Sequence, residues 1–262
     1  MDGRVDPVRI ARVAREICDP DICCFQEVAE NFASLAGSSG ENQPELLQNL
    51  FAGYSAHFAW AVDVADGKGG RRRFGNLILS RLPVHQVLRH SLPWPPEAGV
   101  PNMPRVAIEA VAEAPWGPVS IMTTHLEYYS AMQRSAQVER LCDLEAENNL
   151  HATAIPATTY QSGPFQPFRR PASSILCGDF NMRPEDPLVA ALRSRWNDAW
   201  QAAHPGAPHP PTFCLHGKEH GDTPYCCDFV FVSPDLVPRI VSVRVDLETQ
   251  ASDHQPVVVE FQ

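Results

Sequence analysis

Residues 175–187 read ILCGDFNMRPEDP, an apolar run that ends in Asp179 and Asn181. The run at 175–178 is short and apolar, with cysteine acting as a small hydrophobe, and it predicts a buried strand. A helix is predicted after the prolines, at about 188–192. A carboxylate beside a strand core costs free energy unless it is paired or bound to a cation. The end of this strand is therefore a candidate site.

Similar arrangements recur along the chain, because other apolar runs also end in or contain acidic and histidine residues. They are FQE at 25–27, TTHL at 123–126, SDH at 252–254 and Asp228 within CCDFVF at 226–231. Each has an ordinary structural explanation by itself: Glu27 could cap a helix, His125 could be a hydrogen-bonded core residue, and Asp179 could start a turn. Five such coincidences in one chain favour a shared functional site instead.

The remaining sequence predicts a single α/β domain, residues 1–262, that is rich in antiparallel strands. Helices are expected from Asp6-Pro7 to Ile17, over 46–51 with Gly53 as C-cap, and over 130–149. Two long loops, at 154–173 and 204–224, are typical of functional lids or mobile segments. Strands are expected at 22–25, between 54 and 126, and at 229–232, 240–245 and 257–261.

Composition limits the classes of function. The net charge of −10 argues against a protein that coats nucleic acid, although it does not exclude an enzyme that cuts it. Arg71–Arg73 is the one dense basic run, so a smaller phosphorylated substrate is slightly favoured. No apolar run is long enough to span a membrane. The eight cysteines form no CxxC pair and no export signal is visible, which predicts free thiols and a cytoplasmic location.

The residue types of the five clusters fit one kind of reaction. Oxygen ligands with few histidines suit Mg²⁺ or Mn²⁺ better than zinc. Such a cation polarises a phosphoryl oxygen and stabilises a leaving alkoxide. A histidine beside a carboxylate can act as a general base or donate a hydrogen bond to a phosphate. The sequence therefore predicts metal-dependent hydrolysis of a phosphoester, either a nucleic acid or a small phosphorylated molecule.

Six motifs, taken in order, resemble the endonuclease/exonuclease/phosphatase superfamily of deoxyribonuclease-like phosphoesterases. They are FQEV at 25–28, GNLILSRLPV at 75–84, THLEYYS at 124–130, GDFNMRPEDP at 178–187, CDFVFVS at 227–233 and SDHQPVVVE at 252–260. The combination of GDFN with a distant SDHxPV is specific. The resemblance implies a four-layer sandwich, in which two mostly antiparallel sheets are flanked by helices and the metal site lies at one edge.

The resemblance also implies roles for nine residues. Glu27 is similar to the family's main metal ligand, with Asp253 as a second contributor near the metal. Asn76 and Arg81 are implied as substrate-binding residues, although Arg81 can also be interpreted as a support for its loop. The implied catalytic residues are His125, Asp179, Asn181, Asp228 and His254.

Each implied catalytic residue has a distinct expected task. Asp179 orients or deprotonates the attacking water, and Asn181 beside it holds phosphate. His254 contacts the scissile phosphate, while Asp228 fixes its tautomer and charge. His125 corresponds to a phosphate-facing histidine. Cys227, where many relatives carry a charged residue, is expected to have little consequence.

One departure from the family pattern leaves alternatives open. Relatives begin with a strand that carries an asparagine of the metal site, and no such strand precedes Arg4 here. We therefore expect either that the natural chain starts upstream of Met1 or that another segment fills the gap. A catalytically impaired phosphoester-binding protein is one alternative function. A zinc hydrolase is another, based on four histidines without HExxH spacing: His204, His209, His216 and His220.

Overall fold

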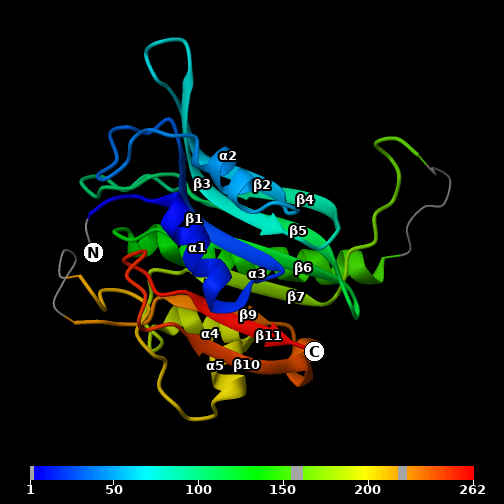
Figure 1. The fold of residues 1–262 in the computed structure, drawn as a ribbon. Helices are drawn as coiled ribbons and strands as arrows, with labels where there is room; N and C mark the ends of the chain where they lie inside the picture. Colours follow the sequence, from blue (N-terminus) through cyan, green and yellow to red (C-terminus); the bar gives the residue numbers. More distant parts are fainter. Residues whose placement is uncertain (1–2, 155–161, 218–222) are drawn as a thin grey trace.

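A computed structural model describes residues 3–154, 162–217 and 223–262 and shows a sandwich of β-sheets flanked by helices (Figure 1). Parts of the two predicted long loops, 155–161 and 218–222, lie outside the described residues. One layer is a six-stranded mixed sheet of order β4-β5-β6-β7-β9-β8. Its strands are β4 (Val84–Ser91), β5 (Val106–Ala114), β6 (Gly117–His125), β7 (Ser174–Asp179), β8 (Asn197–Asp198) and β9 (Asp228–Val232).

The second layer is divided into two antiparallel sheets. One has the order β1-β3-β2, with β1 (Ile22–Glu30), β2 (Ser55–Ala65) and β3 (Arg71–Ser80), and the other pairs β10 (Ile240–Val245) with β11 (Val257–Phe261). Both pack their apolar side chains against the six-stranded sheet. The predicted α/β sandwich is thus confirmed. Within the described residues, β1 and β11 are each paired along one edge only.

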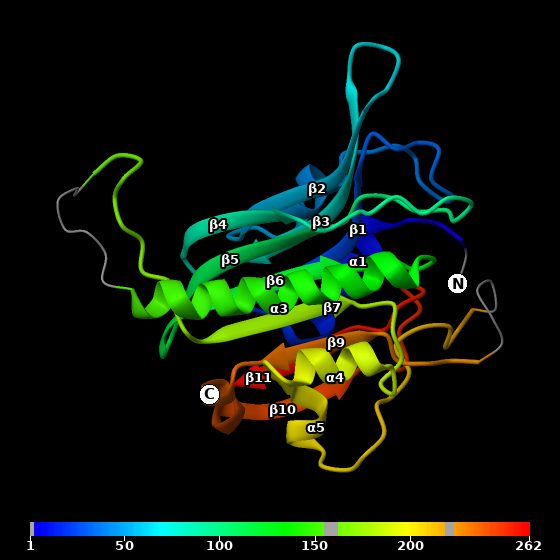
Figure 2. The same cartoon turned by 180° about the vertical axis from the view of Figure 1, so that it is seen from behind.

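Helices cover the outer faces of both layers. α1 (Pro7–Cys18) and α2 (Gln43–Leu50) pack on the three-stranded sheet, and Figure 2 shows α3 (Ala131–Thr153) lying along the six-stranded sheet. α4 (Pro187–Arg193) packs against the same apolar core as α3. α5 (Ala199–Ala203) and the 3-10 helix at Pro234–Arg239 complete the set in the described chain. None of the described helices has the length and apolar character required to cross a bilayer.

Local sequence signals explain most helix boundaries. Asp6 caps α1 by accepting a hydrogen bond from the Arg9 amide at 3.0 Å, as predicted. Ser130 caps α3 in the same way, and Asp186 precedes Pro187 at the start of α4. The prediction for α2 was wrong at one residue. Its C-cap is Phe51, and Gly53 lies two residues further on in the left-handed region, at φ 88°.

The register of three neighbouring strands determines where the site lies. β6 and β7 run parallel because α3 carries the chain back, and this pairing sets His125 beside Asp179. β9 is antiparallel to β7 and sets Asp228 on the other side of Asp179. Gly178 makes the close approach possible, since a Cβ at its φ of 135° would lie 2.0 Å from the Thr124 carbonyl oxygen. Three strand ends therefore present their polar side chains at one edge.

The contact between α3 and β7 contains a buried carboxyl group, Glu145, that accepts hydrogen bonds from Ser174 at 3.1 Å. Burial raises the pKa of Glu145 to about 7, with a smaller contribution from the nearby Glu109 carboxylate. The pKa of Glu145 is higher in the folded than in the unfolded protein, so proton binding to Glu145 increases the free energy of unfolding. This contribution has its full value below roughly pH 4.3. It is lost as the pH rises through about 7.

We therefore expect Glu145→Gln to stabilise the protein at pH 8 by on the order of 2 kcal/mol, while changing it little at pH 4.5. Urea unfolding at the two pH values measures this difference. Glu147→Gln on the same helix is the control, because Glu147 is ion-paired with Arg140 at an exposed position. Equal effects of Glu145→Gln at both pH values would contradict the assignment.

Candidate active site

Three side chains, from β6, β9 and the turn before β11, converge around the Asp179 carboxylate at the end of β7. His125 at the end of β6 places Nε2 3.4 Å from Asp179 Oδ2, and His254, in the turn before β11, places Nε2 3.9 Å from the same oxygen. On its other side, His254 Nδ1 lies 2.9 Å from Asp228 Oδ2. A carboxylate accepts hydrogen bonds only, so Nδ1 of His254 is the donor to Asp228.

Glu27 joins this group from the other layer of the sandwich. The register between β1 and β3 shifts between Phe25 and Val28, and within this bulge Glu27 has a φ of 58°. The bulge turns its side chain toward β6, where Oε1 lies 3.7 Å from His125 Nδ1. The Glu27 side chain is 63% exposed, whereas that of Asp179 is 7% exposed. The site therefore has one buried carboxyl group and one accessible carboxylate.

The charges of the site are strongly coupled. Burial raises the pKa of Asp179 to about 7, and the adjacent Asp228 carboxylate contributes further. Burial alone would lower the pKa of His254, but the carboxylates of Asp228, Asp179 and Asp253 raise it to about 10. His254 is thus an imidazolium cation at neutral pH, held by Asp228.

His125 has the opposite protonation. Burial, together with the positive charges of Arg105 and His254, holds its pKa well below the usual range. A neutral imidazole has one N–H donor, so His125 can donate to Glu27 or to Asp179 but not to both at once. It links the exposed carboxylate of one layer to the buried carboxylate of the other.

Three of the other implied residues differ in their burial and in their hydrogen-bond partners. Asn181, with a φ of 51°, donates its backbone N–H to Asp179 Oδ1 at 2.8 Å and its side-chain amide to the Leu126 carbonyl at 2.9 Å. Asn76 is fully buried opposite the Glu27 bulge and donates to the Val106 carbonyl. Asp253 is exposed beside His254 and accepts a hydrogen bond from Ser252.

Arg81 lies away from this group, in contrast to the substrate-binding role that the resemblance implied. Its guanidinium pairs with Asp19 and Asp21. Asp21 precedes Glu27 by six residues of extended chain, which is roughly 20 Å. The structure therefore fits the other interpretation of Arg81, a support for its loop.

The sequence did not predict two sets of contacts in this site, those of Cys227 and those of Thr212. The Cys227 thiol donates to Asp228 Oδ2 at 3.4 Å, and its sulfur lies 4.0 Å from His254 Nδ1. Thr212 Oγ1 accepts the backbone N–H groups of Cys227 and Asp228 at 3.1 and 3.2 Å. Thr212 lies at the end of a proline-rich loop, and nothing in its local sequence indicates that it positions Asp228.

The Thr212 contacts lead to a prediction about stability. Thr212→Val keeps the side-chain shape but leaves two buried N–H groups without this acceptor, so we expect a loss of about 1–3 kcal/mol in the free energy of unfolding. Thr212→Ser retains the oxygen and should recover much of that loss. Urea denaturation of both variants tests this, and equal stabilities would show that Thr212 contributes by packing alone.

The candidate donors for a divalent cation at this edge are the Glu27 carboxylate and the group of Asp179, Cys227 and His254. The atoms of Asp179, Cys227 and His254 lie within 4.8 Å of one another, but they suit a metal poorly. Burial and the Asp228 charge raise the pKa of Cys227 strongly, so its thiol is protonated and is a weak ligand. His254 is protonated as well. The exposed Glu27 carboxylate offers oxygen donors of the kind that Mg²⁺ and Mn²⁺ prefer.

The three described histidines of the zinc alternative do not converge. His204 contacts the Val243 carbonyl, His209 contacts Asp198 and His216 contacts the Leu247 carbonyl. His220 lies outside the described residues. All eight cysteines are free thiols, as predicted.

Comparison with known proteins gives the class. The sequence profile of the Endonuclease/Exonuclease/phosphatase family matches residues 3–254. The chain therefore belongs to the endonuclease/exonuclease/phosphatase family, as its motifs predicted. No curated protein sequence matched it.

Solved structures share the fold at low sequence identity. The 3′ phosphatase NExo from Neisseria, bound to a product DNA hairpin, is 20% identical, with 99% of this chain and 96% of that chain covered and a TM-score of 0.64. Truncated Caenorhabditis elegans TDP2 is 19% identical over 98% of this chain and 94% of that chain, with a TM-score of 0.63. The Bacteroides thetaiotaomicron mannosyl-6-phosphatase Bt3783 is 18% identical over 98% and 90%, with a TM-score of 0.62.

Proposed function

We propose that this protein is a divalent-metal-dependent phosphoester hydrolase in which Asp179 and His254 act on a water molecule and a phosphate. The observation that carries the proposal is the placement of the buried Asp179 carboxyl beside His254, whose other ring nitrogen is held by Asp228. Asp179 is a buried carboxyl whose pKa is about 7, and it lies 3.9 Å from the imidazolium of His254. A base tuned near neutral pH beside a fixed cation suits hydrolysis of an anionic ester.

In the proposed reaction, each of these side chains has one task. Asp179 Oδ2 accepts a proton from the attacking water, while the Asn181 backbone N–H holds Oδ1. His254 donates from Nε2 to a phosphate oxygen and stabilises the charge that develops there, since Nδ1 is occupied by Asp228. Neutral His125 lies between the carboxylates of Glu27 and Asp179 and donates its single N–H to one of them at a time.

A metal completes the proposal. Glu27 would hold Mg²⁺ or Mn²⁺, with Asp253 nearby, and the bound ion would polarise a phosphoryl oxygen and stabilise the leaving alkoxide. Four carboxylates lie in this part of the protein: Glu27, Asp179, Asp228 and Asp253. Burial first, and then the charges of Asp228 and Glu27, raise the pKa of Asp179, and a bound cation would offset the repulsion between these carboxylates.

The relatives leave the substrate class open. NExo is described as a 3′ phosphatase with a DNA product, and Bt3783 as a mannosyl-6-phosphatase. The same fold thus accompanies a DNA product in one solved structure and a mannosyl-6-phosphatase name in another. Fold similarity alone does not select between them.

A panel of phosphodiesters and phosphomonoesters assayed with Mg²⁺, Mn²⁺ and Zn²⁺ in turn tests the function. We expect turnover with Mg²⁺ or Mn²⁺, and loss of turnover with EDTA. Binding of phosphoesters without hydrolysis under every metal would support the catalytically impaired binding protein instead. Turnover with zinc alone would contradict the hard-cation assignment.

A further inference from the structure

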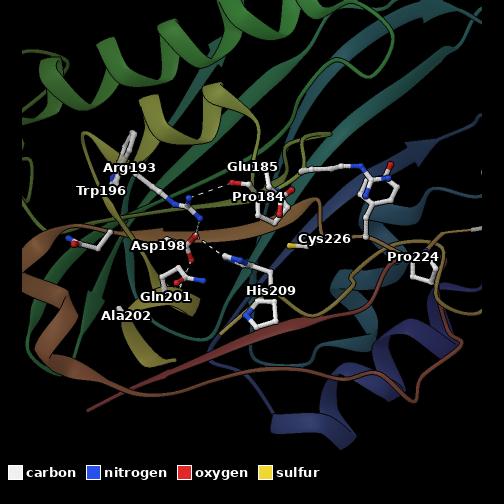
Figure 3. A pocket seen from close by; sticks show the side chains of 14 residues that line it. Pro184, Glu185, Arg193, Trp196, Asp198, Gln201, Ala202, His209, Pro224 and Cys226 are labelled. Carbon is white, nitrogen blue, oxygen red and sulfur yellow. Dashed lines mark hydrogen bonds and ion pairs between the residues drawn. The ribbon is translucent and has the colours of Figure 1, made fainter. Parts of the chain in front are cut away.

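A cavity of about 750 Å³ opens beside the active site, between α4, β8, α5 and the segment at 224–226. Figure 3 shows side chains from these elements pointing into it. The described residues that line it include Arg183, Arg193, Asp198, Gln201, His209 and Tyr225. Its size lies within the range of small-molecule sites.

The cavity and the active site share a wall. Tyr225 lines the cavity, and its ring lies 5.5 Å from that of Phe213, whose ring is in turn 4.6 Å from His254. The Arg183 guanidinium lies 4.1 Å from the centre of the Tyr225 ring, two residues after Asn181 along the chain. A molecule whose phosphate lies at His254 can therefore extend over Tyr225 into the cavity.

The floor of the cavity contains a hydrogen-bonded polar cluster whose side chains are not part of the hydrolytic site. Asp198 Oδ2 accepts from His209 Nε2 at 2.9 Å and from Arg193 at 2.7 Å. The His209 and Asp198 side chains are 4% and 3% exposed, and the His209 ring packs 5.4 Å from that of Phe229. Such buried, paired groups keep a fixed geometry that can orient a ligand.

The lining discriminates between classes of ligand. Two arginines, Arg183 and Arg193, are balanced by two acidic residues, Glu185 and Asp198, so the cavity does not favour a second cluster of phosphates. Its carboxylates, guanidinium groups and amides disfavour a hydrocarbon tail. A flat ring with donors and acceptors on its edge fits both the aromatic rim and the polar interior.

We propose that this cavity binds the nucleobase of a substrate whose phosphate is held at Asp179 and His254. The inference rests on the proposed function, and it makes the substrate a nucleotide, either free or at the end of a nucleic-acid strand. Tyr225 and Arg183 form the passage between phosphate and base. Gln201 faces the edge of the nucleobase, as does Arg193, which is paired with Asp198.

Two chromogenic diesters test the proposal: methyl p-nitrophenyl phosphate, and the p-nitrophenyl ester of thymidine 5′-monophosphate. We expect KM to be about tenfold or more lower for the thymidine ester, as stacking and edge contacts predict. Ala202→Trp, which fills the cavity from α5, should remove that advantage and leave the methyl ester unchanged. Ala190→Trp, at an exposed position of α4, is the matched control.

A second variant tests the proposal independently, in case Ala202→Trp does not fold. Arg183 is exposed, so Arg183→Ala should fold normally and raise KM for the thymidine ester severalfold, whereas exposed Arg195→Ala should not. Calorimetry supplies a readout without turnover. We expect adenosine 5′-monophosphate to bind roughly tenfold more tightly than ribose 5-phosphate, and Ala202→Trp to abolish the difference.

The outcomes separate the two proposals. Equal KM values for the two esters, with equal binding of adenosine 5′-monophosphate and ribose 5-phosphate, would overturn the nucleobase site while the hydrolase stands. Base-dependent binding without hydrolysis of any ester would overturn the hydrolase while the nucleobase site stands. An oligonucleotide series then identifies the source. A KM that stops falling after one nucleotide indicates a free nucleotide, and a KM that continues to fall indicates a strand end.

Discussion

His254→Ala should lower kcat by roughly a hundredfold or more, because it removes the one imidazolium that can donate to the phosphate from beside Asp179. The cation exists at neutral pH since Asp228, 2.9 Å away, together with Asp179 and Asp253, raises its pKa to about 10 despite burial. Steady-state kinetics with the best ester of the panel measures the loss. KM should change less than kcat, since the interaction strengthens as charge develops.

His85→Ala provides the control for this prediction. His85 is an exposed histidine that also pairs with a carboxylate, Glu113 at 2.8 Å, but it lies on β4 at the far edge of the sheet. We expect its kcat to match the parent protein. If His254→Ala instead lowers the melting temperature strongly and activity falls in proportion to the folded fraction, His254 is a structural residue and the assigned role is wrong.

Much of the fold could be predicted because local signals and tertiary packing agree. Asp6 is an N-cap in the sequence prediction and in the structure, and it precedes an apolar helical repeat. The apolar runs before Asp179 and Asp228 are strands because their side chains are buried between layers. The recurrence of polar strand ends indicated a shared site, but no local pattern specifies which strands become neighbours.

The contacts that could not be predicted are those set by register and loop path. Arg81 lies within the same motif as Asn76, yet the strand carries the two residues to different places: Asn76 opposite the bulge and Arg81 beside Asp21. A bulge adds a residue without a sequence signature, so the direction of the Glu27 side chain was not readable. Thr212 reaches Asp228 through a loop whose course depends on tertiary contacts.

Glu27→Gln should weaken Mg²⁺ or Mn²⁺ binding by about tenfold or more and lower the rate at a fixed metal concentration by roughly a hundredfold. The reason is geometric. Glu27 is the accessible carboxylate at this edge, its bulge holds it near His125, and an amide oxygen binds a hard cation without the negative charge. Titration of activity against metal concentration separates the two effects, since added metal should restore part of the rate.

Glu30→Gln, three residues further along β1, is the matched control because Glu30 pairs with Arg73 at 3.1 Å instead of facing the site. We expect its metal titration to match that of the parent protein, and Asp253→Asn to shift the titration less than Glu27→Gln does. A Glu27→Gln protein that keeps both its rate and its metal midpoint would show that the cation binds elsewhere. The Asp179–Cys227–His254 group would then be the next candidate, despite its protonated thiol and imidazolium.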